Sequence, residues 1–314
     1  MADDLFVVAD FIADALDVDK TMTSEVLNAS PLVSRLPIGD TADGSEVHKY
    51  NKYTGAPVVG FRSPNDGRDY DASVDTVVSV TCTILDFSWK VDMAVADAWR
   101  QGPEDLIARE GIRHLGAAMF ILEQQCIYGT TSPGDSNGFG GLLTNTDYDA
   151  LADAMVIGGG GTTASEQSSL WAIRTGFDHC RLVTPSARGI SLGDTQVIET
   201  TSTAGGSFPA YYTPASLYIG FQMGGKYSAG RIANLSVTTD TKPLTDDLIS
   251  DLLAAFPSGG GPDFMFTNRT MVKELQQGRT ATNPTGAPAP FPDSAFNVPL
   301  FSTDAITITE AVEV

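Results

Sequence analysis

Two short glycine-containing motifs resemble known functional motifs, and the first matches the nucleophile turn of serine hydrolases. Gly189–Gly193 reads G-I-S-L-G, which fits G-x-S-x-G. That mechanism needs a helix after the serine and a histidine later in the chain. The residues after Ser191 alternate as in a strand, and all three histidines (His48, His114 and His179) precede it. We therefore interpret 189–193 as an ordinary turn, and a serine hydrolase as the less favoured functional alternative.

The second motif nearly matches the phosphate-binding P-loop. Gly220–Tyr227 reads G-F-Q-M-G-G-K-Y, but Tyr227 stands where a Mg²⁺-binding Ser or Thr is required. The next residues, from Ser228, do not begin a helix, so no helix dipole would face a phosphate. We predict a strand, a tight turn and a second strand here.

The cysteines and histidines do not form a recognisable reactive pair or metal site. His179 and Cys180 are adjacent, and neighbours on a strand point to opposite faces, so they cannot share the hydrogen bond of a Cys–His nucleophile. Three scattered cysteines, with Cys82 and Cys126 as the other two, predict buried free thiols. No zinc spacing is present, and the turn Asn65–Asp71 lacks the distal Glu of a calcium loop. We expect a non-enzymatic protein without cofactor or metal.

Composition narrows the class of protein further. The chain has 314 residues, enough for about two domains, with 39 acidic and 19 basic residues and a net charge of −20. That charge argues against a duplex-DNA clamp and against a polybasic membrane binder. No signal peptide is recognised, and no apolar run approaches the ~20 residues of a membrane helix. Only 18% of residues are charged, which predicts large uncharged surfaces covered by partners.

The first third of the chain predicts a helix, an arm and a long hairpin. Apolar spacing places a short helix at 3–17, and an extended arm continues to about residue 44. Residues 45–91 are typical of a β-hairpin, because Ser63–Gly67 ends in Asp-Gly, a strong turn signal. The second strand alternates apolar and polar side chains from Val74 to Ile84.

A long helix is predicted next, from Pro103 to the residue before Gly129. Proline suits the first helical position and glycine the position after the last. About 26 residues at ~1.5 Å each make a rod of roughly 39 Å. One apolar stripe follows its length, formed by Ile112, Leu115, Met119, Leu122 and Cys126.

The rest of the chain is predicted to be mainly β, with two shorter helices. We expect strands within 169–176 and 180–184 to pair around a turn, and Gly158–Gly161 to be a flexible surface loop. The other predicted elements are an aromatic β stretch over 211–227, helices at 244–256 and 269–277, a strand at 263–267, a loop at 278–292 and short strands at 298–301 and 305–309.

The order of these elements resembles the major capsid proteins of tailed phages, with the α+β Hong Kong 97-type fold. Short sequence motifs, spread over nearly the whole chain, show the same resemblance. They are Glu123–Gly129, Gly138–Leu142, Ser169–Gly176, Lys226–Leu235, Phe264–Thr270 and Val298–Ile306.

The resemblance implies a domain organisation. Its parts are an N-terminal arm (1–44), an extended hairpin loop (45–91), a peripheral domain with the spine helix (92–138), an axial domain (139–284) with a β-rich elaboration at about 165–240, and a return to the peripheral domain (285–314). It also implies self-assembly into pentamers and hexamers of an icosahedral head around double-stranded DNA. The alternative within this fold is an encapsulin, a bacterial shell that holds enzymes.

The resemblance further implies partners and contacts between subunits. We expect a separate scaffolding protein, a portal and in some shells a decoration protein, weak non-specific contact with packaged DNA, assembly in the host cytoplasm and a final place in the virion. Some family members join a hairpin lysine to a distant asparagine, such as Asn283 or Asn297, and we expect no such cross-link here. The hairpin residues expected to meet a neighbouring subunit are Lys49, Lys52, Arg62 and Arg68.

Overall fold

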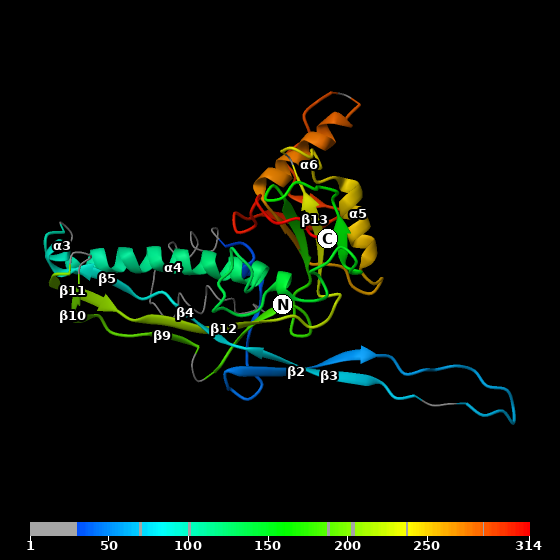
Figure 1. Cartoon of the computed structure of the whole chain (residues 1–314), viewed down its shortest axis with the longest axis horizontal. Coiled ribbons are helices and arrows are strands. Elements are labelled where there is room, and N and C mark those ends of the chain that lie inside the picture. The colour runs from blue at the N-terminus through cyan, green and yellow to red at the C-terminus, as the bar shows by residue number, and fades with distance from the viewer. Residues whose placement is uncertain are drawn as a thin grey trace, which may run out of the picture.

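The computed structural model describes residues 30–68, 71–99, 102–186, 189–201, 205–236, 238–284 and 286–314. The helix expected at 3–17 and most of the expected arm lie outside them. Figure 1 shows three parts: a long helix on a β layer, a sheet with two helices, and a hairpin that projects away from both. Of the helices described, none is long and apolar enough to span a membrane.

Helix α4 (Pro103–Tyr128) confirms the long helix at its expected bounds. Proline begins it, and Gly129 ends it with a φ of 57°, which glycine adopts without strain. The expected apolar stripe is buried except for Ile112, which is half-buried. Gly111 lets the helix approach the layer beneath, since a Cβ there would lie 2.8 Å from Trp89.

The β layer under α4 combines strands from distant parts of the chain (Figure 1). One sheet joins β1, β8, β12 and β4, with β9 also paired to β12, and a second joins β10, β11 and β5 near the start of α4. The short helices η1 (Val33–Arg35), η2 (Leu142–Thr144) and α3 (Met93–Asp97) all contact α4. The strands are β1 (Ile38–Asp40), β4 (Thr83–Asp86), β5 (Trp89–Asp92), β8 (Arg181–Thr184), β9 (Ile190–Leu192), β10 (Gln196–Thr201), β11 (Ser207–Thr213) and β12 (Ala215–Gln222).

The second part is a six-stranded sheet in the order β15-β16-β14-β7-β13-β6. Helix α5 (Asp246–Ala255) packs on β13, where Gly230 leaves room for Leu252 and Phe256. Helix α6 (Arg269–Ala281) begins after Asn268, whose side chain caps it as expected, and runs four residues further than expected. The strands are β6 (Val156–Gly158), β7 (Ser168–Ile173), β13 (Ala229–Leu235), β14 (Phe264–Thr267), β15 (Ser294–Ala295) and β16 (Val298–Ser302).

The hairpin is shorter than the expected 45–91. Among the described strands, β2 (Val47–Gly55) and β3 (Val74–Thr81) pair only with each other, and they project from the body (Figure 1). The turn is confirmed, although Asn65 rather than Gly67 adopts the positive φ, at 65°. The hairpin ends where Cys82 enters the core, because the following strand, β4, pairs with β12 instead of β2. Ile84, expected on the buried face, is therefore exposed.

Three other expectations are wrong. Strands β7 and β8 do not pair, because β7 lies between β13 and β14 whereas β8 lies between β1 and β12. Gly158–Gly161 is not a loose surface loop, since the amides of Gly159 and Gly161 donate to β13 carbonyls at 2.7 and 2.9 Å. Residues 305–309 form no strand; Ala305 and Ile306 are buried there.

Candidate functional site

The hairpin presents apolar side chains that nothing in the described chain covers. Phe61, near its tip, is fully exposed. Large exposed apolar side chains gathered on one projecting element are typical of contact with a partner. The other members of this surface, which we call the hairpin apolar surface together with Phe61, are Tyr53, Val58, Val59, Val74 and Val77.

The four hairpin cations named from the sequence are spread along the hairpin rather than brought together. At the tip, Arg62 Nη1 donates to the Asp66 carbonyl at 3.3 Å, and Arg68 donates to the carbonyls of Gly60, at 3.0 Å, and Val58. These bonds brace the tip. Lys49 is exposed on β2, and Lys52 Nζ lies 2.9 Å from Asp147 Oδ2 of the body.

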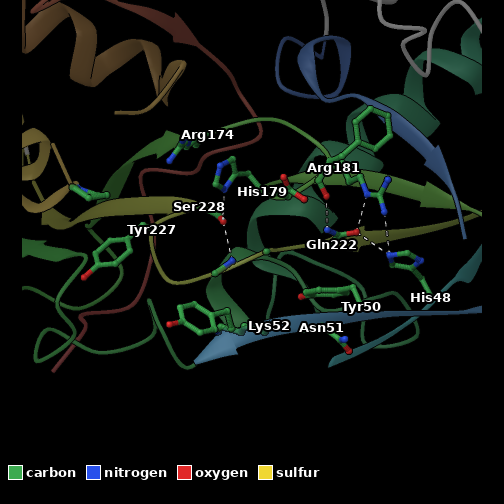
Figure 2. Close-up of a pocket in the computed structure, with 16 residues that line it drawn as sticks. His48, Tyr50, Asn51, Lys52, Arg174, His179, Arg181, Gln222, Tyr227 and Ser228 are labelled. Atoms are coloured by element: carbon green, nitrogen blue, oxygen red, sulfur yellow. Dashed lines mark hydrogen bonds between the residues drawn. The ribbon is translucent and has the colours of Figure 1, made fainter. Parts of the chain in front are cut away.

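Buried polar contacts hold the foot of the hairpin against the body. His48 Nδ1 accepts from the Ala42 amide at 3.2 Å, and its Nε2 lies 2.9 Å from Gln222 Oε1 and 3.2 Å from Arg181 Nη2 (Figure 2). Burial, together with the charge of Arg181, lowers the pKa of His48 and keeps it neutral. Tyr50 donates its hydroxyl proton to the Met223 carbonyl, and burial raises the pKa of Tyr50 to about 12. These contacts therefore fix the direction in which the base of the hairpin leaves the body.

A buried carboxylate on α4 joins three segments that are far apart in sequence. Glu123 is fully buried and accepts from the Leu32 amide at 2.9 Å, the Val33 amide at 3.4 Å and the Thr303 hydroxyl. Burial raises the pKa of Glu123 to about 7, although these donors and Arg35 oppose the shift. Sequence reasoning missed this role; the available signal was an acid directly after Leu122 in the apolar stripe.

Glu123 makes subunit stability depend on pH. Its native pKa of about 7 exceeds the ordinary 4.5, so between these values the folded subunit keeps a proton that the unfolded chain has lost. The free energy of unfolding should therefore fall by roughly 3 kcal/mol as pH rises from 4.5 to 7. We expect Glu123→Gln to remove this slope, measured as the difference between urea-unfolding profiles of the two proteins. Parallel profiles across that window would contradict the assignment.

A second buried network ties the C-terminal segment to the six-stranded sheet. Glu310 accepts from Tyr128 at 2.6 Å and from Ser169 at 3.0 Å, and its other oxygen accepts from Arg231 at 3.4 Å. Arg231 is buried on β13, and its Nη1 also lies 2.9 Å from a carboxylate oxygen of Glu313. Burial raises the pKa of Glu310 and outweighs the charge of Arg231. No sequence spacing pointed to this pair, which is 79 residues apart.

The G-x-S-x-G motif and the His179–Cys180 pair, both rejected as catalytic from the sequence, lack catalytic geometry in the structure. Residues 189–193 are not the ordinary turn expected from the sequence: Ser191 lies within β9 and pairs with Ser216, so it does not stand between a strand and a helix either. His179 Nδ1 lies 3.3 Å from the Ser228 hydroxyl, and the Cys180 thiol is buried. The three cysteines are buried free thiols, as expected. Across the described ranges, no group of three or more His, Cys, Asp or Glu can hold a metal ion.

Comparisons with known proteins agree with this architecture. The model of the family described as "Major capsid protein GP7" matches residues 21–312. A chain in the solved structure of bacteriophage epsilon15 is 20% identical, with a TM-score of 0.64, and the match covers 89% of this chain and 88% of that one. A chain of the bacteriophage JBD30 capsid is 12% identical, with a TM-score of 0.51, over 96% and 99%. At such identities the likeness shows a shared fold alone. No curated protein matches this chain.

Proposed function

This chain belongs to the GP7 family of major capsid proteins, and we propose that it builds an icosahedral head of pentamers and hexamers around double-stranded DNA. It is a structural capsid protein of tailed-phage type with the α+β Hong Kong 97-type fold. The family match favours this role over an encapsulin shell. The observation that carries the proposal is the projecting hairpin, whose apolar surface needs a covering neighbour.

The energetics of the hairpin support contact between subunits. A two-stranded hairpin is marginally stable by itself in water. Fully burying a side chain such as Phe61 contributes about 1.5–3 kcal/mol. Each copy offers one such hairpin, so a closed shell repeats this contact at every subunit. Neighbouring copies thus supply the burial that one chain cannot provide.

The organisation expected from the resemblance stands as part of this proposal. The arm is 1–44, the extended loop 45–91, the peripheral domain 92–138 with α4 as spine, the axial domain 139–284, and the closing segment 285–314. The protein resides in the virion after assembly in the host cytoplasm, with scaffolding, portal and decoration proteins as partners. An inner wall formed by chains of net charge −20 would bind packaged DNA only weakly.

Replacing Phe61 by serine tests this function. Because Phe61 is fully exposed in the single subunit, we expect the melting temperature of unassembled Phe61→Ser to match the wild type. Loss of its burial against a neighbour should raise the protein concentration needed for assembly at least about tenfold. Sedimentation and electron microscopy measure particles, and Phe61→Leu is the apolar control. Shell formation at the wild-type threshold would contradict the role of the hairpin.

The same assay measures the electrostatic share of the hairpin contact. We propose that Arg62 and Arg68, besides bracing the tip, meet acidic surface of a neighbour, and that Lys49 and Lys52 lie near the same interface. Exposed ion pairs contribute only about 0–1 kcal/mol each, but a shell repeats them. Their contribution is separated from that of Phe61 by its salt dependence, because screening weakens charge contacts and leaves apolar burial intact.

A further inference from the structure

A cleft at the foot of the hairpin gathers positive charge in a strongly acidic chain. Its volume is about 580 Å³, and it lies between β2, the end of β7, the start of β8 and the turn after β12 (Figure 2). Its lining has a single carboxylate, Asp178, whereas the whole chain has twice as many acids as bases. The positive charge of the lining comes from Arg174, Arg181 and Lys52, of which Lys52 is paired with Asp147, whereas burial lowers the pKa of the two lining histidines, His48 and His179.

The two arginines of the cleft have no ion-pair partner among the described residues. Arg174 has no carboxylate oxygen within 4 Å there, and the nearby Asp263 accepts instead from the amide and hydroxyl of Thr175. Arg181 donates through Nε to Gln222 Oε1 at 2.7 Å, and its guanidinium lies 5.0 Å from the Phe177 ring centroid. Arg181 is therefore held in place by Gln222, and the Asp178 carboxylate acts on it only from beyond 4 Å.

The surrounding donors are oriented by the same network. Ser228 Oγ accepts from the Gly225 amide at 2.9 Å and lies 3.3 Å from His179 Nδ1. Burial and the charge of Arg174 lower the pKa of His179. Guanidinium donors of this kind suit an oxyanion.

We propose that the cleft binds carboxylate side chains of a second copy of this chain, so that each hairpin foot is an electrostatic contact between subunits. The inference rests on the proposed function, because the occupant is a neighbouring subunit. The cleft is lined by β2 of the hairpin and by Arg174, which directly follows β7 of the six-stranded sheet, so a neighbour that covers the hairpin lies beside it. Every copy carries 39 acids, which supplies the complementary charge. Packaged DNA is disfavoured because a shell of such chains repels it.

Charge reversal at Arg174 tests the contact. We expect Arg174→Glu to raise the assembly threshold about tenfold at low ionic strength, Arg174→Gln to raise it less, and added salt to reduce both effects. Lys273→Glu, an equal charge change on the exposed side of α6, controls for net charge and should assemble within about twofold of the wild type. If Arg174→Glu matches this control, the inference fails. Wild-type shells and a defect in Phe61→Ser would still support the proposed function.

Zero-length carbodiimide coupling identifies the occupant. Shells are assembled from a mixture of ¹⁵N-labelled and unlabelled subunits, and the carbodiimide joins the amines of Lys52, in the cleft, and of the adjacent Lys226 to nearby carboxylates. Mass spectrometry then identifies the linked residues. The pair Lys52–Asp147 is the internal control for links within one chain. Links from either lysine to an acid of the oppositely labelled copy support the proposal. Links found only between residues that carry the same label would overturn the proposal. So would a variant that assembles normally but loses binding of inorganic phosphate when Arg174 is replaced, since the cleft would then be a small-anion site.

Discussion

Replacing Arg231 by methionine is expected to lower the free energy of unfolding of the subunit by about 3–5 kcal/mol. The reason is the partner left behind: Glu310 is buried, and without Arg231 its charge would have no cation beside it. A protonated Glu310 avoids that charge, so the loss should grow as pH rises above the ordinary carboxyl pKa. Urea unfolding followed by tryptophan fluorescence measures the change, with Trp171 lying 5.2 Å from the Arg231 guanidinium.

Two further variants separate the buried pair from a general effect of losing an arginine. Adding Glu310→Gln to Arg231→Met should recover part of the stability, because it removes the orphaned charge. Arg269→Met makes the same change at an exposed position on α6 and should cost less than about 0.5 kcal/mol. A loss below about 1 kcal/mol for Arg231→Met would show that the pair is not needed to hold the C-terminal segment.

Replacing Leu122 by aspartate is expected to prevent the subunit from folding. Leu122 is 1% exposed in the core beneath α4, and next to it Glu123 already has its carboxylate buried. An unpaired charge at this position costs several kcal/mol, comparable with the whole 5–15 kcal/mol stability of a typical protein. Soluble yield and circular dichroism of the purified chain measure the outcome.

The neighbouring residue provides a matched control. Ile121 is 44% exposed, so Ile121→Asp introduces the same group one position away on the solvent side of α4. We expect that subunit to fold with a stability close to the wild type, and Leu122→Met to lose less than about 1.5 kcal/mol. Equal soluble yield for Leu122→Asp and Ile121→Asp would refute the burial of this face of α4.

Features whose signals lie within a few residues could be predicted from the sequence. Pro103 and Gly129 set the two ends of α4, and the spacing of its apolar residues identified the buried face. The side chain of Asn268 caps α6, and the turn at 63–67 closes the hairpin. These signals act locally, through backbone angles, caps and side-chain periodicity, so no tertiary contact is needed to interpret them.

The tertiary structure decided which strands pair and which polar groups are buried together. Apolar and polar side chains alternate no more clearly in β7 than in β8. All six residues of β7 are nevertheless buried, because β13 and β14 flank the strand and α5 covers the sheet. Local alternation shows that a segment is a strand but does not name its partner. The same holds for the charges: Glu123 meets Leu32 and Thr303 across 91 and 180 residues. Sequence alone therefore determined α4, α5 and α6, the turn of the hairpin and the family resemblance, whereas burial in the folded core decided the extent of the hairpin, the sheet order, the raised carboxylate pKa values and the basic cleft.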